Sequence, residues 1–166
     1  MSTEVQPTIS RLSPRMADQV SGLISRVVLS LSYYNQRAKA EEVAKYTADG
    51  LVNIVRDDPD AVLVAVVDHR PVGFCISRYD DGLIWLAWFG VDPDFRTRGI
   101  GRRLLEALAM TISDRRAHKI WCDTRTANRL SQSVLQHFGF KKVAQLTNHW
   151  YGQDFFLWEW LPCEQE

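Results

Sequence analysis

The segment Arg96-Thr97-Arg98-Gly99-Ile100-Gly101 has the residue types and spacing in this chain that best suit a defined chemistry, the binding of an anion. Its glycines leave the backbone open to a phosphate, and four arginines fall within residues 96–103. The first N–H groups of an α-helix lack partners inside the helix, so a loop that leads into a helix presents free donors. Arginine adds charge-assisted hydrogen bonds. The segment therefore predicts a phosphate-binding loop.

Two common nucleotide-binding motifs do not match this segment. A P-loop requires Lys followed by Ser or Thr after its last glycine, whereas Arg102-Arg103 follows Gly101. A dinucleotide-binding fingerprint requires a third glycine where this chain has Leu104, and a parallel βαβ unit, whereas the strands before the loop are predicted to be antiparallel. A simple turn before a helix is the remaining alternative, and it leaves the clustered arginines as a coincidence.

The loop is placed by a strand before it and a helix after it. The apolar run Leu83–Val91 predicts a strand that ends just before the polar residues. After the loop, apolar residues recur at helical spacing, at Ile100, Leu104, Leu105, Leu108 and Ile112. The loop therefore joins the end of a strand to the N-terminus of an amphipathic helix.

The rest of the chain divides into short periodic segments separated by turn signals such as Asp80-Asp81-Gly82. Three strands joined by tight turns indicate an antiparallel meander before the loop. We predict an α/β fold in one domain over residues 1–166, a mixed sheet with helices on its faces, in the order β-α-α-β-β-β-α-β-α-β-β. The other expected elements are strands Thr8–Leu12, Ala61–Val67, Val72–Tyr79, Lys119–Thr124, Phe140–Tyr151 and Phe155–Leu161, and helices Pro14–Leu31, Arg37–Val55 and Asn128–Phe138.

Composition argues against several classes of protein. The 166 residues carry 20 basic and 20 acidic side chains, and a net charge of zero disfavours nucleic acid as a partner. Cys75, Cys122 and Cys163 are far apart and form no CxxC pair, so we expect reduced thiols and no metal site. No apolar run approaches the ~20 residues of a membrane span, and residues 1–10 lack a signal core. We expect a cytoplasmic protein that binds no membrane.

Residues 89–140 resemble the GNAT superfamily of N-acetyltransferases. Val91-x-Pro93 followed by Arg96-x-x-Gly99-x-Gly101, between a strand and a leucine-rich helix, is similar to that family's coenzyme A pyrophosphate loop. A helix that opens at Asn128 and ends in Gly139-Phe140 is similar to the family's next motif. The resemblance implies a GNAT-like fold with acetyl-coenzyme A (acetyl-CoA) as cosubstrate and no metal.

The same resemblance assigns residues to the coenzyme. It places the thioester beside the end of the strand, where a backbone N–H polarises the carbonyl, and the pyrophosphate on the loop. It places the asparagine of the second motif and a small residue one turn later beside the coenzyme, although Asn128 can equally be an ordinary helix N-cap. The expected cofactor-binding residues are Phe89, Gly90, Val91, Arg96, Thr97, Arg98, Gly99, Ile100, Gly101, Arg102, Asn128 and Ser131.

Acetyl transfer to an amine also requires a neutral amine and a proton for the leaving thiolate. Many members of the family place a tyrosine acid where this chain has Leu135, and some place a glutamate base where it has Trp85. The hairpin His149–Phe155 resembles one in the family's peptide N-terminal acetyltransferases, in which a tyrosine beside the turn meets substrate. We predict Tyr151 as the substrate contact or substitute acid, and His149 as the next candidate. The alternative is an aromatic hairpin packed on the core.

The six tryptophans offer a further reading, a pocket for a cationic or flat substrate. Trp85 and Trp88 are three residues apart, so they face opposite sides of a regular strand. They can share a pocket only if the strand contains a bulge, and aromatic residues of this kind are more often core or interface anchors.

Together these features predict an N-acetyltransferase that moves acetyl from acetyl-CoA to a primary amine by direct attack in a ternary complex. Peptide N-termini, lysine side chains and small amines stay open as acceptors. The alternative is a non-catalytic module that binds acyl-coenzyme A or serves as an interaction domain, which the missing tyrosine and carboxylate favour. Cys122 lies on a predicted strand, which disfavours a covalent cysteine route. The aromatic C-terminal region makes a homodimer possible.

Overall fold

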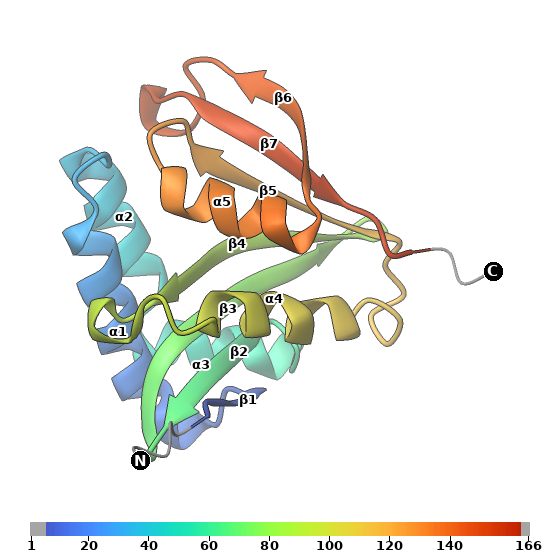
Figure 1. The fold of residues 1–166 in the computed structure, drawn as a ribbon. Helices are drawn as coiled ribbons and strands as arrows, with labels where there is room; N and C mark the ends of the chain where they lie inside the picture. The colour runs from blue at the N-terminus through green and yellow to red at the C-terminus, as the bar shows by residue number, and fades with distance from the viewer. Residues whose placement is uncertain (1–5, 164–166) are drawn as a thin grey trace, which may run out of the picture.

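A seven-stranded mixed sheet forms the centre of the computed structural model, which describes residues 6–163 (Figure 1). The strand order is β1-β2-β3-β4-β5-β7-β6, and all neighbours are antiparallel except β4 and β5. The strands are β1 Thr8–Arg11, β2 Val62–Val67, β3 Arg70–Asp80, β4 Leu83–Val91, β5 Lys119–Arg125, β6 Lys141–Leu146 and β7 Phe155–Trp160.

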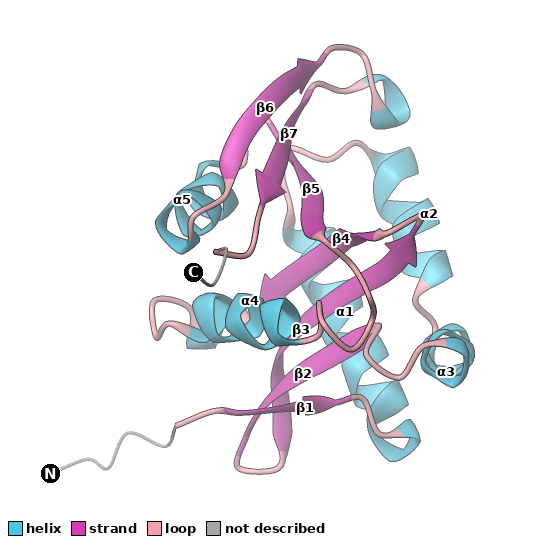
Figure 2. Ribbon diagram, turned by 90° about the vertical axis from the view of Figure 1, so that its right-hand side faces the viewer, coloured by secondary structure: helices cyan, strands magenta, loops and turns pink. Residues whose placement is uncertain are grey.

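Helices cover both faces of this sheet. Figure 2 shows α4 and α5 on one side and α1, α2 and α3 on the other. The bounds are α1 Ala17–Ser30, α2 Gln36–Lys45, α3 Ala48–Asp57, α4 Ile100–Met110 and α5 Arg129–Phe138. None of the helices within residues 6–163 is both long and apolar enough to cross a membrane.

Each helical layer packs on its own apolar core. On one face, Leu104 and Leu108 of α4 are fully buried against strand residues such as Ile120. On the other face, Leu23 of α1 and Phe74 of β3 are fully buried together. The helical spacing of apolar residues in the sequence is therefore the spacing that the two cores require.

The predicted fold class is confirmed, and the strands occur in the predicted order. The second helix differs, because residues 37–55 form nearly all of α2 and most of α3 instead of one helix. Thr47 has extended backbone angles, and its Oγ1 accepts a hydrogen bond from the N–H of Gly50, so it caps a new helix. The carbonyl of Tyr46 accepts a bond from Ser21 Oγ of α1, which fixes the break.

The final hairpin is also looser than predicted. The sequence predicts a strand that continues to Tyr151, whereas β6 ends at Leu146 and a loop follows, with a short 3-10 turn over Trp150–Gly152. Tyr151 has a φ of 54°, which lies in the left-handed region and is incompatible with a strand. Asp154 Oδ1 accepts a bond from the N–H of Asn148 and closes this β6–β7 loop.

A gap opens in the sheet where β4 and β5 separate. The two strands pair only over Leu83–Leu86 and Lys119–Cys122. The next residue of β4, Ala87, is the extra residue of a β-bulge, because Leu86 pairs with Ser77 while Trp88 pairs with Ile76. A bulge bends and twists its strand, so it accounts for the separation. It also places Trp85 and Trp88 on the same face of the sheet.

Candidate functional site

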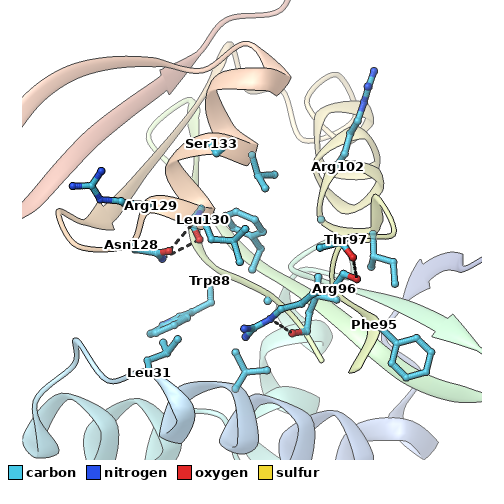
Figure 3. A pocket seen from close by; sticks show the side chains of 18 of the residues that line it. Leu31, Trp88, Phe95, Arg96, Thr97, Arg102, Asn128, Arg129, Leu130 and Ser133 are labelled. Carbon is cyan, nitrogen blue, oxygen red and sulfur yellow. Dashed lines mark hydrogen bonds between the residues drawn. The ribbon is translucent and has the colours of Figure 1, made fainter. Parts of the chain in front are cut away.

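A cavity of about 1010 Å³ lies at this gap. Its walls come from the end of β4, the loop that follows it, the start of α4, one side of α5 along its length, and the end of α1 with the segment after it (Figure 3). All the cofactor-binding residues predicted from the sequence line it except Arg98. The structure therefore brings together two motifs that are about thirty residues apart in the chain.

The loop leading to α4 presents free backbone donors to this cavity. Gly99 is the N-cap of α4 with a φ of 73°, a conformation that favours glycine, and a Cβ there would meet no atom within 4 Å. No acceptor among the described residues bonds to the N–H groups of Ile100, Gly101 or Arg102. Open space beside unpaired N–H groups is what a phosphate requires at a helix N-terminus.

The arginines of the loop take different orientations. Arg96 points into the cavity, and its Nε donates to the carbonyl of Val91 at 3.4 Å (Figure 3). Arg98 stacks instead on the ring of Phe95, with 5.0 Å between its guanidinium carbon and the ring centroid. Arg102 extends away and pairs with Glu106 at 3.0 Å. Among these three residues, Arg96 is thus the one whose charge is placed for an anion in the cavity.

The N-terminus of α5 forms the facing wall. Asn128 is its N-cap, because Oδ1 accepts from the N–H of Ser131 at 3.1 Å and Nδ2 donates to Ser131 Oγ at 2.9 Å. The capping role that the sequence allowed is thus present, and both residues also line the cavity. A coenzyme contact by Asn128 or Ser131 stays a prediction.

The end of β4, which pairs with β3 but no longer with β5, forms the floor. Phe89, Gly90 and Val91 line the cavity beyond the last pair with β5. A Cβ at position 90 would lie 2.8 Å from Cζ of Phe74 and 3.0 Å from Val27 Cγ1, so Gly90 is required by the close packing beneath it. The strand's backbone, rather than its side chains, therefore faces the gap at this point.

The two predicted catalytic residues lie outside the cavity lining. The hydroxyl of Tyr151 donates to Glu42 Oε1 at 3.1 Å, and burial and the Glu42 charge raise the pKa of this phenol. The ring of His149 packs against Trp150 in a tilted arrangement, with ring centroids 4.4 Å apart. Leu135, at the family's usual tyrosine position, is fully buried. The roles of Tyr151 and His149 stay predictions.

Glu42 was not anticipated from the sequence. It lies on α2 and is only 7% exposed. Its Oε1 accepts from Lys45 Nζ at 2.8 Å and from the Tyr151 hydroxyl, and its Oε2 accepts from the Trp88 indole at 2.8 Å. Because Trp88 also lines the cavity, this carboxylate is connected to the cavity through one side chain.

Asp123 was also not anticipated. It is the first residue of β5 beyond the pairs with β4, and its Oδ2 accepts from Trp150 Nε1 at 2.6 Å. Burial raises the pKa of this carboxyl above its usual value, while the bond from Trp150 and the nearby His149 act in the opposite direction. Asp123 is a candidate functional residue because of its place at the gap, and no local sequence motif marks it.

Tyr33 connects the segment after α1 to the far half of the sheet. Its side chain lines the cavity. Its carbonyl accepts from Arg125 Nε at 3.2 Å and Nη2 at 3.1 Å, and from Gln153 Nε2 at 3.2 Å. Arg125 is on β5 and Gln153 is in the β6–β7 loop, so one peptide group bridges the open end of the gap.

A mixed sheet that splits beside a glycine-arginine loop at a helix N-terminus defines an α/β protein whose cavity at the split is suited to a phosphate-bearing ligand. Comparison with known proteins identifies the family. Residues 27–140 match the acetyltransferase (GNAT) family, and since this is more than half of the chain, the chain belongs to that family. Within residues 6–163, no three His, Cys, Asp or Glu side chains are grouped to hold a metal ion.

Individual relatives support the family at lower coverage. The chain is 30% identical over 88 residues to the [ribosomal protein bS18]-alanine N-acetyltransferase of Salmonella typhimurium, a match that covers 53% of this chain and 60% of the relative. It is 27% identical over 110 residues to the aminoglycoside N(6')-acetyltransferase type 1 of the same organism, covering 61% of this chain and 75% of the relative. The chain thus spans less than two thirds of the first relative's length.

Two solved structures share the fold. PaiA N-acetyltransferase from Thermoplasma acidophilum, in complex with coenzyme A, superposes with a TM-score of 0.79 at 19% identity, covering 94% of this chain and 99% of that chain. Ard1 from Thermoplasma volcanium gives a TM-score of 0.75 at 23% identity, covering 96% and 100%. At these identities the similarity concerns the fold alone.

Proposed function

We propose that this chain is an N-acetyltransferase that transfers the acetyl group of acetyl-CoA to a primary amine by direct attack in a ternary complex. The observation that carries the proposal is one shared cavity, onto which the loop before α4, the end of β4 that no longer pairs with β5 and the N-terminus of α5 all open. Hydrogen-bond donors to phosphate at one wall, and the edge of β4 without a β5 partner at another, suit an extended ligand with a phosphate end and a reactive end.

The residues present fit such a ligand. Bound acetyl-CoA supplies an activated thioester. We assign the pyrophosphate to the free N–H groups of Ile100, Gly101 and Arg102 and to the guanidinium of Arg96. We assign the thioester carbonyl to the backbone of Phe89–Val91 on the edge of β4 that has no β5 partner, which lies at the sheet gap.

An amine acceptor is supported by the relatives. One is named for acetylating an alanine of a ribosomal protein and another for acetylating an aminoglycoside. Both acceptors are primary amines, although one is a protein and the other a small molecule. We therefore propose a primary amine as the acceptor class for this chain, and both kinds belong in its test.

The first experiment measures binding and turnover separately. Isothermal titration calorimetry gives the Kd for acetyl-CoA, and a thiol reagent follows coenzyme A release with four amines: an alanine-initiated peptide, an N-acetylated lysine peptide, spermidine and kanamycin. We expect turnover with at least one amine. In a double variant, Arg96→Ala with Gly101→Leu, affinity for acetyl-CoA should fall by about tenfold or more, because a charge-assisted bond contributes ~1.5–3 kcal/mol and the leucine fills the cradle.

A matched control is Arg15→Ala with Gly22→Leu. Arg15 is exposed at the start of the first helical layer, and a Cβ at Gly22 would meet only Arg26, at 3.8 Å. This control should bind acetyl-CoA as the unaltered chain does. Undiminished affinity in the Arg96→Ala, Gly101→Leu variant would show that the cofactor site is elsewhere.

The second candidate is a non-catalytic module that binds acyl-coenzyme A. It is favoured by the full burial of Leu135, which leaves no acid at the family's usual tyrosine position. Tight acetyl-CoA binding without thiol release for any of the four amines would support the module and overturn the transferase.

A further inference from the structure

Side chains from five separate segments meet on the face of the gap opposite α4 and α5. Tyr34, from the segment between α1 and α2, packs on Trp88 with ring centroids 5.5 Å apart. Glu42 of α2 accepts a hydrogen bond from the same indole, and Asp123 of β5 accepts one from Trp150 of the β6–β7 loop. Trp88 also lines the cofactor cavity, so this cluster adjoins the position proposed for the thioester.

Two carboxylates in this cluster differ in how fully they are used. Both oxygens of Glu42 are occupied, Oε1 by Lys45 and Tyr151 and Oε2 by Trp88. Other side chains of the protein therefore already donate hydrogen bonds to both carboxylate oxygens of Glu42. It orients the phenol and the indole, and it has little capacity left for a substrate.

Asp123 has one oxygen occupied and one open. Oδ2 accepts from Trp150, while no described residue donates to Oδ1. Oδ1 is nevertheless absent from the fully buried side-chain atoms without a partner, which are Arg115 Nε and Gln153 Oε1. Solvent therefore reaches Oδ1, and a ligand can too.

The place of Asp123 in the sheet puts its carboxylate beside the gap. Leu86 and Cys122 form the last pair of β4 with β5, so Asp123 is the first β5 residue without a β4 partner. Cys122 and Thr124 are buried in the core on the α4–α5 side, and strand alternation places Asp123 on the opposite face. The coenzyme cavity and the Asp123 carboxylate therefore adjoin the same opening from its two sides.

We propose that Asp123 binds the acceptor amine at this opening and removes the proton that keeps it unreactive. This proposal rests on the proposed acetyltransferase function. The ammonium loses one proton to Asp123, which later passes it to water. The amine nitrogen then forms a bond to the acetyl carbon as the bond from that carbon to sulfur breaks, and the second proton lost by nitrogen goes to the sulfur. The products are an amide and a free thiol.

Neighbouring aromatic rings suit a cation at this place. The rings of Tyr34 and Trp88 lie on the same side of the sheet as Asp123, and aromatic faces attract ammonium groups. Glu42 acts here as a positioning residue, because it reaches the opening only through Trp88 and Tyr151. The site therefore favours compact primary ammonium groups over neutral alcohols or thiols.

The test replaces Asp123 with asparagine, which keeps its size. With the best of the four amines, kcat/KM should fall by about 100-fold or more, as loss of a general base does, while the Kd for acetyl-CoA stays unchanged. The decrease of kcat/KM toward acid pH that belongs to this carboxylate should also disappear. Other charged or titratable groups face Asp123, namely Glu42, Arg78 and His149, with Tyr34 nearby, so a His149→Gln variant is profiled in parallel.

Glu159→Gln is the matched control. Glu159 lies on the same face, and its Oε1 accepts from an indole, Trp121 Nε1, at 2.9 Å, much as Asp123 accepts from Trp150. It pairs across from Trp121, away from the gap, so its replacement should leave kcat/KM and the pH profile unchanged. An equal effect of both replacements would mean a structural role and would overturn the proposal.

The outcomes separate the two levels of inference. Near-normal turnover and an unaltered pH profile in Asp123→Asn overturn the role of Asp123 and leave the transferase function standing. Tight acetyl-CoA binding without turnover of any amine by the unaltered chain overturns both. Turnover that is lost in Asp123→Asn together with acetyl-CoA binding also refutes the role, since the defect then lies in the cofactor site.

Discussion

Replacing the two partners of one ion pair, one at a time, should cost very different free energies of unfolding. Arg115, just after α4, contacts Asp58 through Nη2 at 2.6 Å and donates from Nη1 to Ser77 Oγ at 2.8 Å. The side chain of Arg115 is 5% exposed and that of Asp58 is 29% exposed. The pair ties the end of α3 to β3 and to the segment before β5.

The magnitudes follow from this difference in burial. Asp58→Asn keeps the oxygen that accepts from the N–H of Asp60 but leaves a buried guanidinium without a countercharge. Removing one partner of a buried pair costs ~3–5 kcal/mol, and we expect about 3 kcal/mol because the bond to Ser77 remains. Arg115→Met removes the buried charge together with Nε, a buried donor without a partner. Asp58 is then rehydrated, so we expect a loss of about 1 kcal/mol.

Urea unfolding followed by tryptophan fluorescence measures both values by linear extrapolation. Arg11→Met is the control, because Arg11 forms a similar pair with Asp60 at 2.8 Å but is 61% exposed. An exposed pair contributes little, so this variant should lose no more than about 0.5 kcal/mol. Equal losses for Asp58→Asn and Arg115→Met, or a larger loss for Arg115→Met, would refute the reasoning from burial.

Two further predictions concern titratable groups. Burial raises the pKa of the Cys75 thiol to about 12 and that of Cys122 in the same direction, so iodoacetamide should alkylate only Cys163 in the folded chain, as mass spectrometry can check. Burial also raises the pKa of Asp123. Between the unfolded and the folded pKa, the folded state therefore holds a proton that the unfolded chain has already released. Stability should therefore fall as pH rises from about 4, the unfolded value, through the folded one. Asp123→Asn should remove this loss of stability with rising pH. If the urea midpoint of the variant and that of the unaltered chain depend on pH in the same way, the prediction is wrong.

Much of the fold, and the walls of the cavity formed by the loop before α4 and the start of α5, could be predicted because their signals are local. The loop before α4 is specified by glycine and arginine spacing within six residues, and the amphipathic helix behind it by a regular apolar period. Asn128 likewise signals its own role, since an N-cap is recognised three residues away.

The cluster around Glu42 and Asp123, where we propose the acceptor binds, could not be predicted because its contacts are distant in sequence. Glu42 meets Tyr151 across 109 residues, and Asp123 meets Trp150 across 27. A partial signal exists for Glu42, which lies one turn after Ala38 on the buried face of α2, where a charge needs partners. For Asp123, strand alternation specifies the face but not that β4 ends its pairing there.

The bulge at Ala87 is a third case. Three residues between Trp85 and Trp88 mean opposite faces in a regular strand, and only the register with β3 reverses that conclusion. No residue in the segment Leu83–Val91 marks the bulge, because Ala87 is compatible with an ordinary strand. Tertiary pairing, rather than local propensity, decides this detail.

The carbonyl of Tyr33 has a consequence for how the molecule can diversify. The gap between β4 and β5 is closed at its narrow end by four residue pairs, and at its wide end the carbonyl of Tyr33 ties the α1–α2 segment to β5 and the β6–β7 loop through Arg125 and Gln153. Because a backbone atom makes this tie, the ring of Tyr33 can be exchanged without removing it. The side chain at position 33, which can select among ligands at the gap, can therefore change during evolution while the backbone tie stays the same.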